Sequence, residues 1–106
     1  MSSTLPVVVQ PAGRLDTLGA RALESELHDW LSRGETHSLV DFSTTPYIGS
    51  HGLRVLLRAC QAAHRHGGAV KFCCANARVV EIIEMTGFDE VFELYDTRAA
   101  GEQAFE

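Results

Sequence analysis

The residues with the most evident chemical potential are Ser50 and His51, in the segment Gly49-Ser50-His51-Gly52. A serine beside a histidine is a pair that hydrolases use, but their nucleophile elbow has the spacing G-x-S-x-G, which this segment lacks. Adjacent residues at the start of a helix also point in different directions, so a direct hydrogen bond between Ser50 and His51 is badly placed. The sequence therefore predicts a protein that is not an enzyme.

Ser50 has two other possible roles. Serine is preferred at the N-cap of a helix, and a capping role is the simplest one for this residue. The unpaired N–H groups and the positive dipole end of a helix start would also receive a phosphate on the hydroxyl. Such a phosphate adds about −1.5 to −2 charge to a small surface, which would release a bound partner. Spacing alone leaves both roles open.

Cysteines and histidines form the other candidate site. Cys60 and His64 are four residues apart and share a helix face, His66 is nearby, and Cys73-Cys74 follow on a predicted strand. No pair has the C-x-x-C spacing typical of zinc sites, and three cysteines make no disulfide framework. We expect reduced thiols that pack as small hydrophobic groups, and neither a metal nor another cofactor.

An alternation of strands and helices positions these residues. Apolar, β-branched runs predict strands at residues 6–10, 38–42, 69–74 and 91–95. Apolar residues at helical spacing predict helices between the strands and after the last one. This alternation requires crossover connections, so we predict an α/β fold with a small, mostly parallel sheet of about four strands and about four helices packed on it. The 106 residues fit a single domain. The predicted helices begin after Asp16 or Thr17, near Ser50, after Asn76, and after Asp96 or Thr97.

Charge and hydropathy exclude two classes of partner. The net charge of −5 disfavours a nucleic acid. No apolar run reaches the roughly 18 to 20 residues that cross a bilayer. Residues 1–4 lack the basic start and apolar middle of a signal peptide. We therefore expect a cytoplasmic protein without membrane insertion.

Five short motifs, in the correct order, resemble one known family. Gly13-Arg14-Leu15-Asp16 resembles its G-x-L-D segment, and residues 39–43 (LVDFS) resemble its vvlDls strand. Residues 48–57 (IGSHGLRVLL) resemble its (D/S)-S-x-G-L-x-x-L-L signature. Gly67-Gly68, and then residues 80–88 with Val91-Phe92, resemble its closing pattern. This family is the STAS domain, named for sulfate transporters and anti-sigma factor antagonists, and the chain resembles the bacterial antagonist branch in length.

The resemblance implies a mechanism of partner switching. Antagonists of the family bind an anti-sigma factor, which is also a serine kinase, and so free a sigma factor. The kinase phosphorylates the serine that matches Ser50, the modified protein no longer holds its partner, and a serine phosphatase of the metal-dependent class resets it. ATP and magnesium would belong to the partner. The expected partner-binding face comprises Gly13, Arg14, Asp16, Tyr47, Ile48, Gly49, His51, Gly52, Leu53, Arg54, Asn76 and Arg78.

Two departures from the family pattern support an alternative function. The residue before the serine is often aspartate in the family and is Gly49 here; the residue after it is often serine or alanine and is His51 here. Without the acidic neighbour, a phosphate on Ser50 meets one negative charge less, and His51 could pair with that phosphate. The aspartate could equally serve recognition by the kinase. The alternative is therefore a STAS scaffold, or a subunit of a signalling or lipid-transport complex, that is not phosphorylated.

A third departure concerns the first predicted strand. Family members often carry an extra strand before the one that matches residues 7–10, and only Met1–Leu5 precede it here. An exposed sheet edge invites pairing with another chain. We expect a weak homodimer through this edge, which light scattering at high protein concentration would detect.

Overall fold

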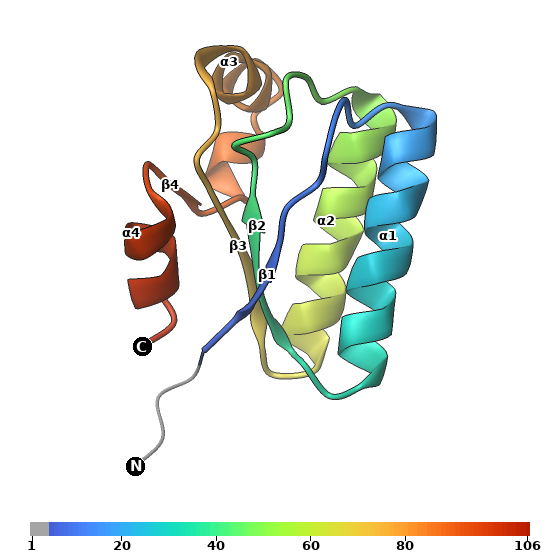
Figure 1. The fold of residues 1–106 in the computed structure, drawn as a ribbon, viewed down its shortest axis with the longest axis vertical. Coiled ribbons are helices and arrows are strands. Elements are labelled where there is room, and N and C mark those ends of the chain that lie inside the picture. Colours follow the sequence, from blue (N-terminus) through green and yellow to red (C-terminus); the bar gives the residue numbers. More distant parts are fainter. Residues whose placement is uncertain (1–4) are drawn as a thin grey trace.

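The computed structural model describes residues 5–106, whose strands form one parallel sheet in the order β1-β2-β3-β4 (Figure 1). The predicted α/β fold, with four strands and four helices, is confirmed. The strands are β1 (Val7–Val9), β2 (His37–Asp41), β3 (Ala69–Cys73) and β4 (Leu94–Tyr95). The helices are α1 (Thr17–Ser32), α2 (Ser50–Arg65), α3 (Ala77–Met85) and α4 (Arg98–Gln103), with a 3₁₀ turn at Phe88–Glu90. The segment without signal-peptide features, residues 1–4, lies outside the described residues.

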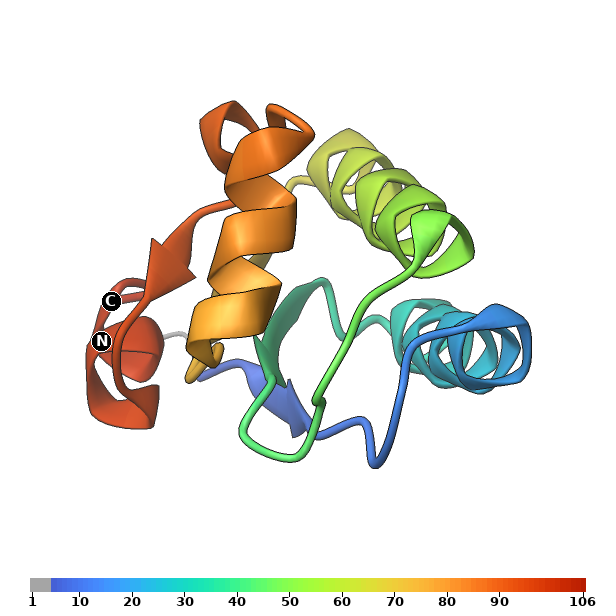
Figure 2. The same cartoon turned by 90° about the horizontal axis from the view of Figure 1, so that it is seen from above.

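Helices cover both faces of the sheet. Figure 2 shows α1 and α2 on one side and α4 on the other. Alternate strand residues point to opposite faces. Val40 and Phe72 belong to the core shared with α1, α2 and α3, whereas Leu39 and Cys73 lie within contact distance of a Cβ placed on Gly101 of α4. This double coverage buries the two central strands, β2 and β3.

A row of aromatic rings forms the centre of the larger core. Phe72 is fully buried, its ring stacks on Phe42 at a centroid distance of 5.6 Å, and it meets the ring of Phe92 at 4.8 Å. Phe42 follows the last residue of β2, so burial of its ring anchors the start of the loop that leads to α2. The first residue of the loop between β2 and α2 is therefore held in place by the core.

Side-chain caps begin three of the helices. Asp16 accepts a hydrogen bond from Gly19 N, Asn76 from Val79 N, and Thr97 from Ala100 N. These caps confirm the predicted helix starts at Asp16 and Asn76 and settle the choice at the last helix in favour of Thr97.

The predicted strand at residues 91–95 is wrong in its first half. Only Leu94 and Tyr95 pair with β3, and a 3₁₀ turn at Phe88–Glu90 precedes them. Phe92 turns inward instead, and its ring stacks on Phe88 at 5.2 Å and packs against Phe72. Burial of an aromatic ring outweighs the weaker preference of this run for extended backbone.

One edge of the sheet is β1, and the start of β1 lies away from the first turn of α2 (Figure 1). β1 pairs only with β2 among the described residues, which agrees with the exposed edge expected there; the weak homodimer stays a prediction. The strand β1 starts, and the chain ends after α4, in the lower half of the view in Figure 1, whereas α2 begins at the top.

Candidate functional site

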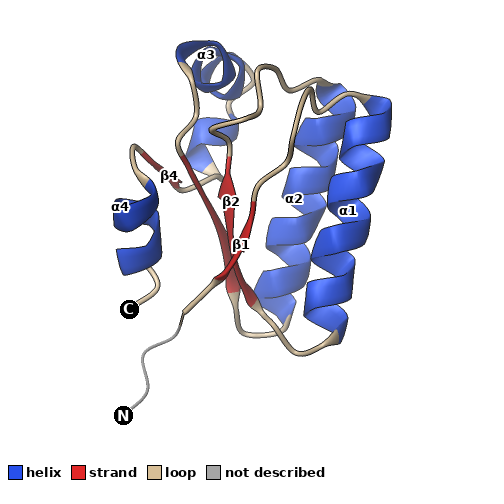
Figure 3. Ribbon diagram, viewed as in Figure 1, coloured by secondary structure: helices blue, strands red, loops and turns tan. Residues whose placement is uncertain are grey.

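The loops that follow β1 and β2 run together at one end of the sheet (Figure 3). Leu15 N donates to Tyr47 O at 2.9 Å, and Gly49 N donates to Leu15 O at 3.0 Å. Leu15 and Ile48 form an isolated parallel bridge, and both side chains are buried. The structure thus brings together the two segments that sequence analysis placed on one face, residues 13–16 and 47–54.

Further hydrogen bonds hold the outer parts of these loops. Gly13 N donates to Thr44 O at 2.9 Å, and the φ angle of +87° at Gly13 is one that side chains rarely allow. The hydroxyls of Thr44 and Thr45 both donate to Pro11 O, at 2.9 and 3.0 Å. The loops therefore form one ordered surface.

The third predicted segment joins this surface through one residue. Asn76, the cap of α3, donates from Nδ2 to Thr45 O at 3.4 Å. Arg78 is exposed and forms an ion pair of 2.8 Å with Glu81 on its own helix. A hydrogen bond therefore links Asn76 to the loops, whereas the ion pair of Arg78 stays within α3.

Ser50 is the first residue of α2, and the N-cap is Gly49, which has no side chain to form a capping bond. The simple capping role for Ser50 is therefore wrong. The side chain of Ser50 is exposed, and no group among residues 5–106 forms a hydrogen bond with its hydroxyl oxygen. An unengaged hydroxyl in the first turn of a helix is open to chemical modification.

The glycines on either side of Ser50 have different structural roles. A Cβ on Gly52 would lie 2.8 Å from Leu15 O, 2.9 Å from Leu15 Cβ and 3.0 Å from Ile48 Cγ2, so glycine allows α2 to approach the first loop closely. A Cβ on Gly49 would make only ordinary contacts, the nearest at 3.6 Å. Gly49 can therefore be replaced without a clash.

Replacement of Gly49 by aspartate is expected to raise the free energy of unfolding by roughly 0.3 kcal/mol, because aspartate at an N-cap accepts a backbone hydrogen bond that glycine cannot accept. The extended backbone of Gly49 (φ −94°, ψ −178°) suits such a cap. Urea unfolding of the wild type and of Gly49→Asp measures the difference. Gly49→Ala, which adds a Cβ without an acceptor, should be less stable than both, and equal stability of the alanine and aspartate variants would contradict the capping explanation.

The remaining residues of the predicted face divide by exposure. Ile48 and Leu53 are buried, so their side chains support the surface from below. Asp16, His51 and Arg54 are exposed. Arg14 is also exposed, and its guanidinium lies 4.6 Å from the centre of the Tyr47 ring, a cation–π contact that orders both side chains.

Sequence analysis missed a hollow between α1 and α2. Its lining includes Arg21 of α1 and His51, Arg54 and Arg58 of α2. The three arginines were visible in the sequence, but the packing of α1 against α2 was not, and no local pattern in the sequence points to the hollow.

Comparison with known proteins assigns the chain to a family. The family model described as "STAS domain" matches residues 2–101. The chain belongs to the STAS domain family.

Proteins similar to this STAS domain protein include ones named as anti-sigma factor antagonists. BtrV of Bordetella bronchiseptica, named as an anti-sigma factor antagonist, is 31% identical over 93 residues, which are 88% of this chain and 80% of BtrV. The crystal structure of TM1081 from Thermotoga maritima superimposes with a TM-score of 0.86 at 20% identity, over 92% of this chain and 85% of TM1081. The Bacillus cell fate determinant SpoIIAA in its phosphorylated form superimposes with a TM-score of 0.73 at 14% identity, over 100% of this chain and 96% of SpoIIAA.

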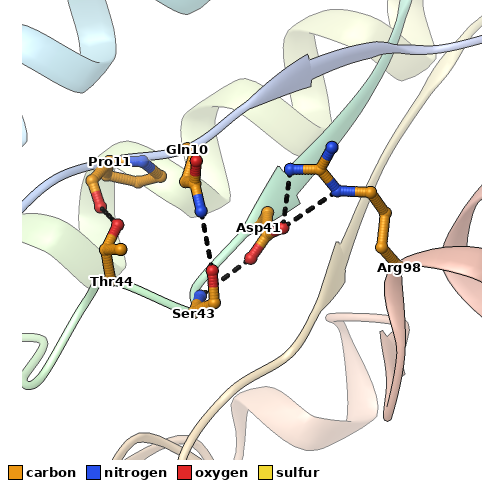
Figure 4. Close-up of polar contacts among 6 residues, drawn as sticks. All are labelled: Gln10, Pro11, Asp41, Ser43, Thr44 and Arg98. Carbon is orange, nitrogen blue, oxygen red and sulfur yellow. Dashed lines mark hydrogen bonds and ion pairs between the residues drawn. The ribbon is translucent and has the colours of Figure 1, made fainter.

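A polar network ties the last helix of this STAS domain to the loop after β2 (Figure 4). The Arg98 guanidinium contacts Asp41 Oδ2 through Nε at 3.0 Å and Nη2 at 2.9 Å. Ser43 N donates to Asp41 Oδ1 at 2.8 Å, and Gln10 Nε2 donates to the Ser43 hydroxyl at 2.7 Å. Burial raises the pKa of Asp41, but the bonds from Ser43 and Arg98 outweigh burial and hold that pKa below its usual value.

We expect Asp41→Asn to lower the free energy of unfolding at neutral pH by roughly 1 kcal/mol, a modest loss because Arg98 is half-exposed to water. The wild-type carboxylate has a lower pKa in the folded than in the unfolded protein, where it titrates near about 4. Its contribution is complete above that pH and is lost as the pH falls through the folded pKa. Urea unfolding at pH 7 and pH 3 should therefore show a smaller difference at pH 3. Asp89→Asn, at an exposed position, is the control; a difference that does not change with pH would contradict the ion-pair explanation.

The structure does not group the cysteines with the histidines as potential metal ligands within residues 5–106. Within the described part of the chain, the one group of three potential metal ligands is Asp41, Cys73 and Cys74, whose ligand atoms lie within 4.8 Å of one another. The Asp41 carboxylate in that group is already bound by Arg98 and Ser43. Burial raises the pKa of the Cys60 thiol to about 12, so it stays protonated and packs as a small apolar group.

Within residues 5–106, no helix has the length and apolar character that a membrane span requires.

Proposed function

We propose that this STAS domain protein is an anti-sigma factor antagonist that binds an anti-sigma factor with serine kinase activity and is switched off by phosphorylation of Ser50. The observation that carries the proposal is the exposed, unengaged hydroxyl of Ser50 in the first turn of α2. This turn lies on the surface formed by the loops after β1 and β2, where ligands of α/β folds bind. The antagonist name of BtrV and the phosphorylated form of SpoIIAA support the proposal.

The exposed residues of the loops and of α2 would contact the partner. Arg14 and Asp16 present charged groups from the first loop, and Arg54 and the imidazole of His51 are exposed on the first turns of α2. In the modification step the γ-phosphoryl group of ATP passes to Ser50 Oγ, ADP leaves, and the hydroxyl proton passes to a base of the kinase. The chain itself is the substrate, ATP and magnesium belong to the kinase, and a serine phosphatase of the metal-dependent class removes the phosphate. All these steps belong to the cytoplasm.

Incubation with the cognate kinase and ATP tests the proposal. Intact-mass spectrometry should show a gain of one phosphate in the wild type and no gain in Ser50→Ala. Ser25→Ala, which removes an exposed serine from α1, is the matched control and should gain one phosphate. A gain that persists in Ser50→Ala would contradict the assignment of the site.

The second candidate function is a scaffold or complex subunit that is never phosphorylated. Gly49 and His51, which depart from the family pattern on both sides of Ser50, favour it. A native pull-down distinguishes the two functions, because a partner with an ATP-binding kinase domain supports the antagonist and a membrane transporter subunit supports the scaffold.

A further inference from the structure

The hollow between the first halves of α1 and α2 is cationic, although the chain as a whole is acidic. It is lined by three arginines and one carboxylate, a local excess of positive charge in a chain of net charge −5. The carboxylate, Glu24, is paired with Arg58 at 2.7 Å. Among residues 5–106, Arg21 and Arg54 form no ion pair. The lining residues are Thr17, Ala20, Arg21, Glu24, His51, Arg54, Val55 and Arg58.

Ser50 precedes His51 in the chain, and His51 lines this hollow. Ser50 and Arg54 are four residues apart in α2, and residues at this spacing are neighbours on one face of a helix. Arg21 lines the same hollow from α1, so Arg21 and Arg54 border one space from two helices. Two guanidinium groups that lack carboxylate partners, next to a modifiable hydroxyl, are suited to hold a phosphate on that hydroxyl.

We propose that Arg54, together with Arg21 across the hollow, binds the phosphate carried by Ser50. This inference rests on the proposed function, since it concerns the phosphorylated protein. Arginine presents a planar fork of N–H donors that matches the oxygens of a phosphate. In the unmodified protein the two arginines are free to meet carboxylates of the partner, and in the modified protein the phosphate occupies them. Phosphorylation then removes a cationic surface as well as adding an anionic group.

Phosphoserine placed at position 50 by genetic code expansion tests the inference without any kinase. The second pKa of the phosphate, followed by ³¹P NMR, should be lower in the folded protein than in the same protein in urea, by roughly half a unit to one unit. Arg54→Gln and Arg21→Gln should each reduce this shift. The matched control, Arg78→Gln, removes an exposed arginine from the first turn of α3 and should leave it unchanged.

Other charged groups near the phosphate require a second control. His51 lines the hollow and carries an ionisable imidazole, so each measurement is repeated in a His51→Gln background. Asp16 and Arg14, on the neighbouring loop, stay in place in every variant. A shift that is equal in Arg54→Gln and Arg78→Gln, or no shift between folded and urea samples, would overturn the inference. A full shift in Arg21→Gln would overturn the role of Arg21.

The outcomes separate this inference from the proposed function. Because phosphoserine is installed during translation, an absent NMR shift overturns the phosphate site and leaves the antagonist proposal standing. Failure of the kinase to modify Ser50 overturns the antagonist proposal, whereas the NMR result still reports on the arginines.

Discussion

Ser50→Asp is expected to weaken binding to the anti-sigma partner by about a thousandfold, whereas Ser50→Ala should leave the affinity largely intact. Ser50 is exposed and lies within the proposed binding surface, so docking of the partner would bury it. A carboxylate at this position would then lose its hydration at the interface, which costs several kcal/mol. About 4 kcal/mol corresponds to a factor of a thousand in the dissociation constant. Aspartate would also pair with Arg54, four residues away, and withdraw it from the partner.

Isothermal titration calorimetry with the purified partner measures this effect. The wild type, Ser50→Ala, Ser50→Asp and the protein with phosphoserine at position 50 form the series. Ser25→Asp adds the same charge to an exposed position on α1 and is the matched control. Equal affinities for the wild type, Ser50→Asp and the phosphorylated protein would contradict the proposal that phosphorylation of Ser50 releases the partner.

The second large effect is expected from Gly52→Ala, which should lower the free energy of unfolding by roughly 1 to 3 kcal/mol. The new Cβ would lie 2.8 Å from Leu15 O and 2.9 Å from Leu15 Cβ. Neither atom can move by a side-chain rotation, so the first loop and α2 must separate. The separation strains the hydrogen bond from Gly49 N to Leu15 O, which joins the loop to the start of α2. Alanine's better helix propensity offsets at most about 1 kcal/mol of the loss.

Urea unfolding and amide hydrogen exchange measure the two parts of this prediction. Exchange at the amides of Leu15 and Gly49 should become faster in Gly52→Ala. His51→Ala puts the same residue at the neighbouring exposed position and should change stability by less than about 0.5 kcal/mol. If the two variants were equally stable, the close approach of α2 to Leu15 would not matter for the fold.

Local sequence signals were sufficient for most of the fold. Asp16 and Asn76 mark helix starts because their side chains accept the first backbone N–H groups, a chemistry visible in the sequence. The convergence of the Leu15 and Ile48 segments was also predictable, because the carboxyl ends of parallel strands meet at one edge of a sheet.

Features that depend on tertiary packing were not predictable. Phe92 leaves the predicted strand to reach Phe72, a choice decided by the shape of the core. The ion pair between Asp41 and Arg98 joins residues 57 positions apart. The position of Arg21 beside Arg54 depends on how α1 packs on α2, which no local pattern specifies. For the candidate site, the sequence therefore indicated the residues around Ser50 but not the cationic hollow beside them.

The position of the C-terminus determines where a tag or a sensor surface can be attached without covering the first turn of α2. The described chain starts before β1 and stops after α4, at the end of the sheet away from Ser50 (Figure 1). An affinity tag, a fluorophore or a biosensor chip joined after Glu106 would leave the loops after β1 and β2 open to solution. An attachment at that end would also leave the first turn of α2 accessible to the kinase that we propose.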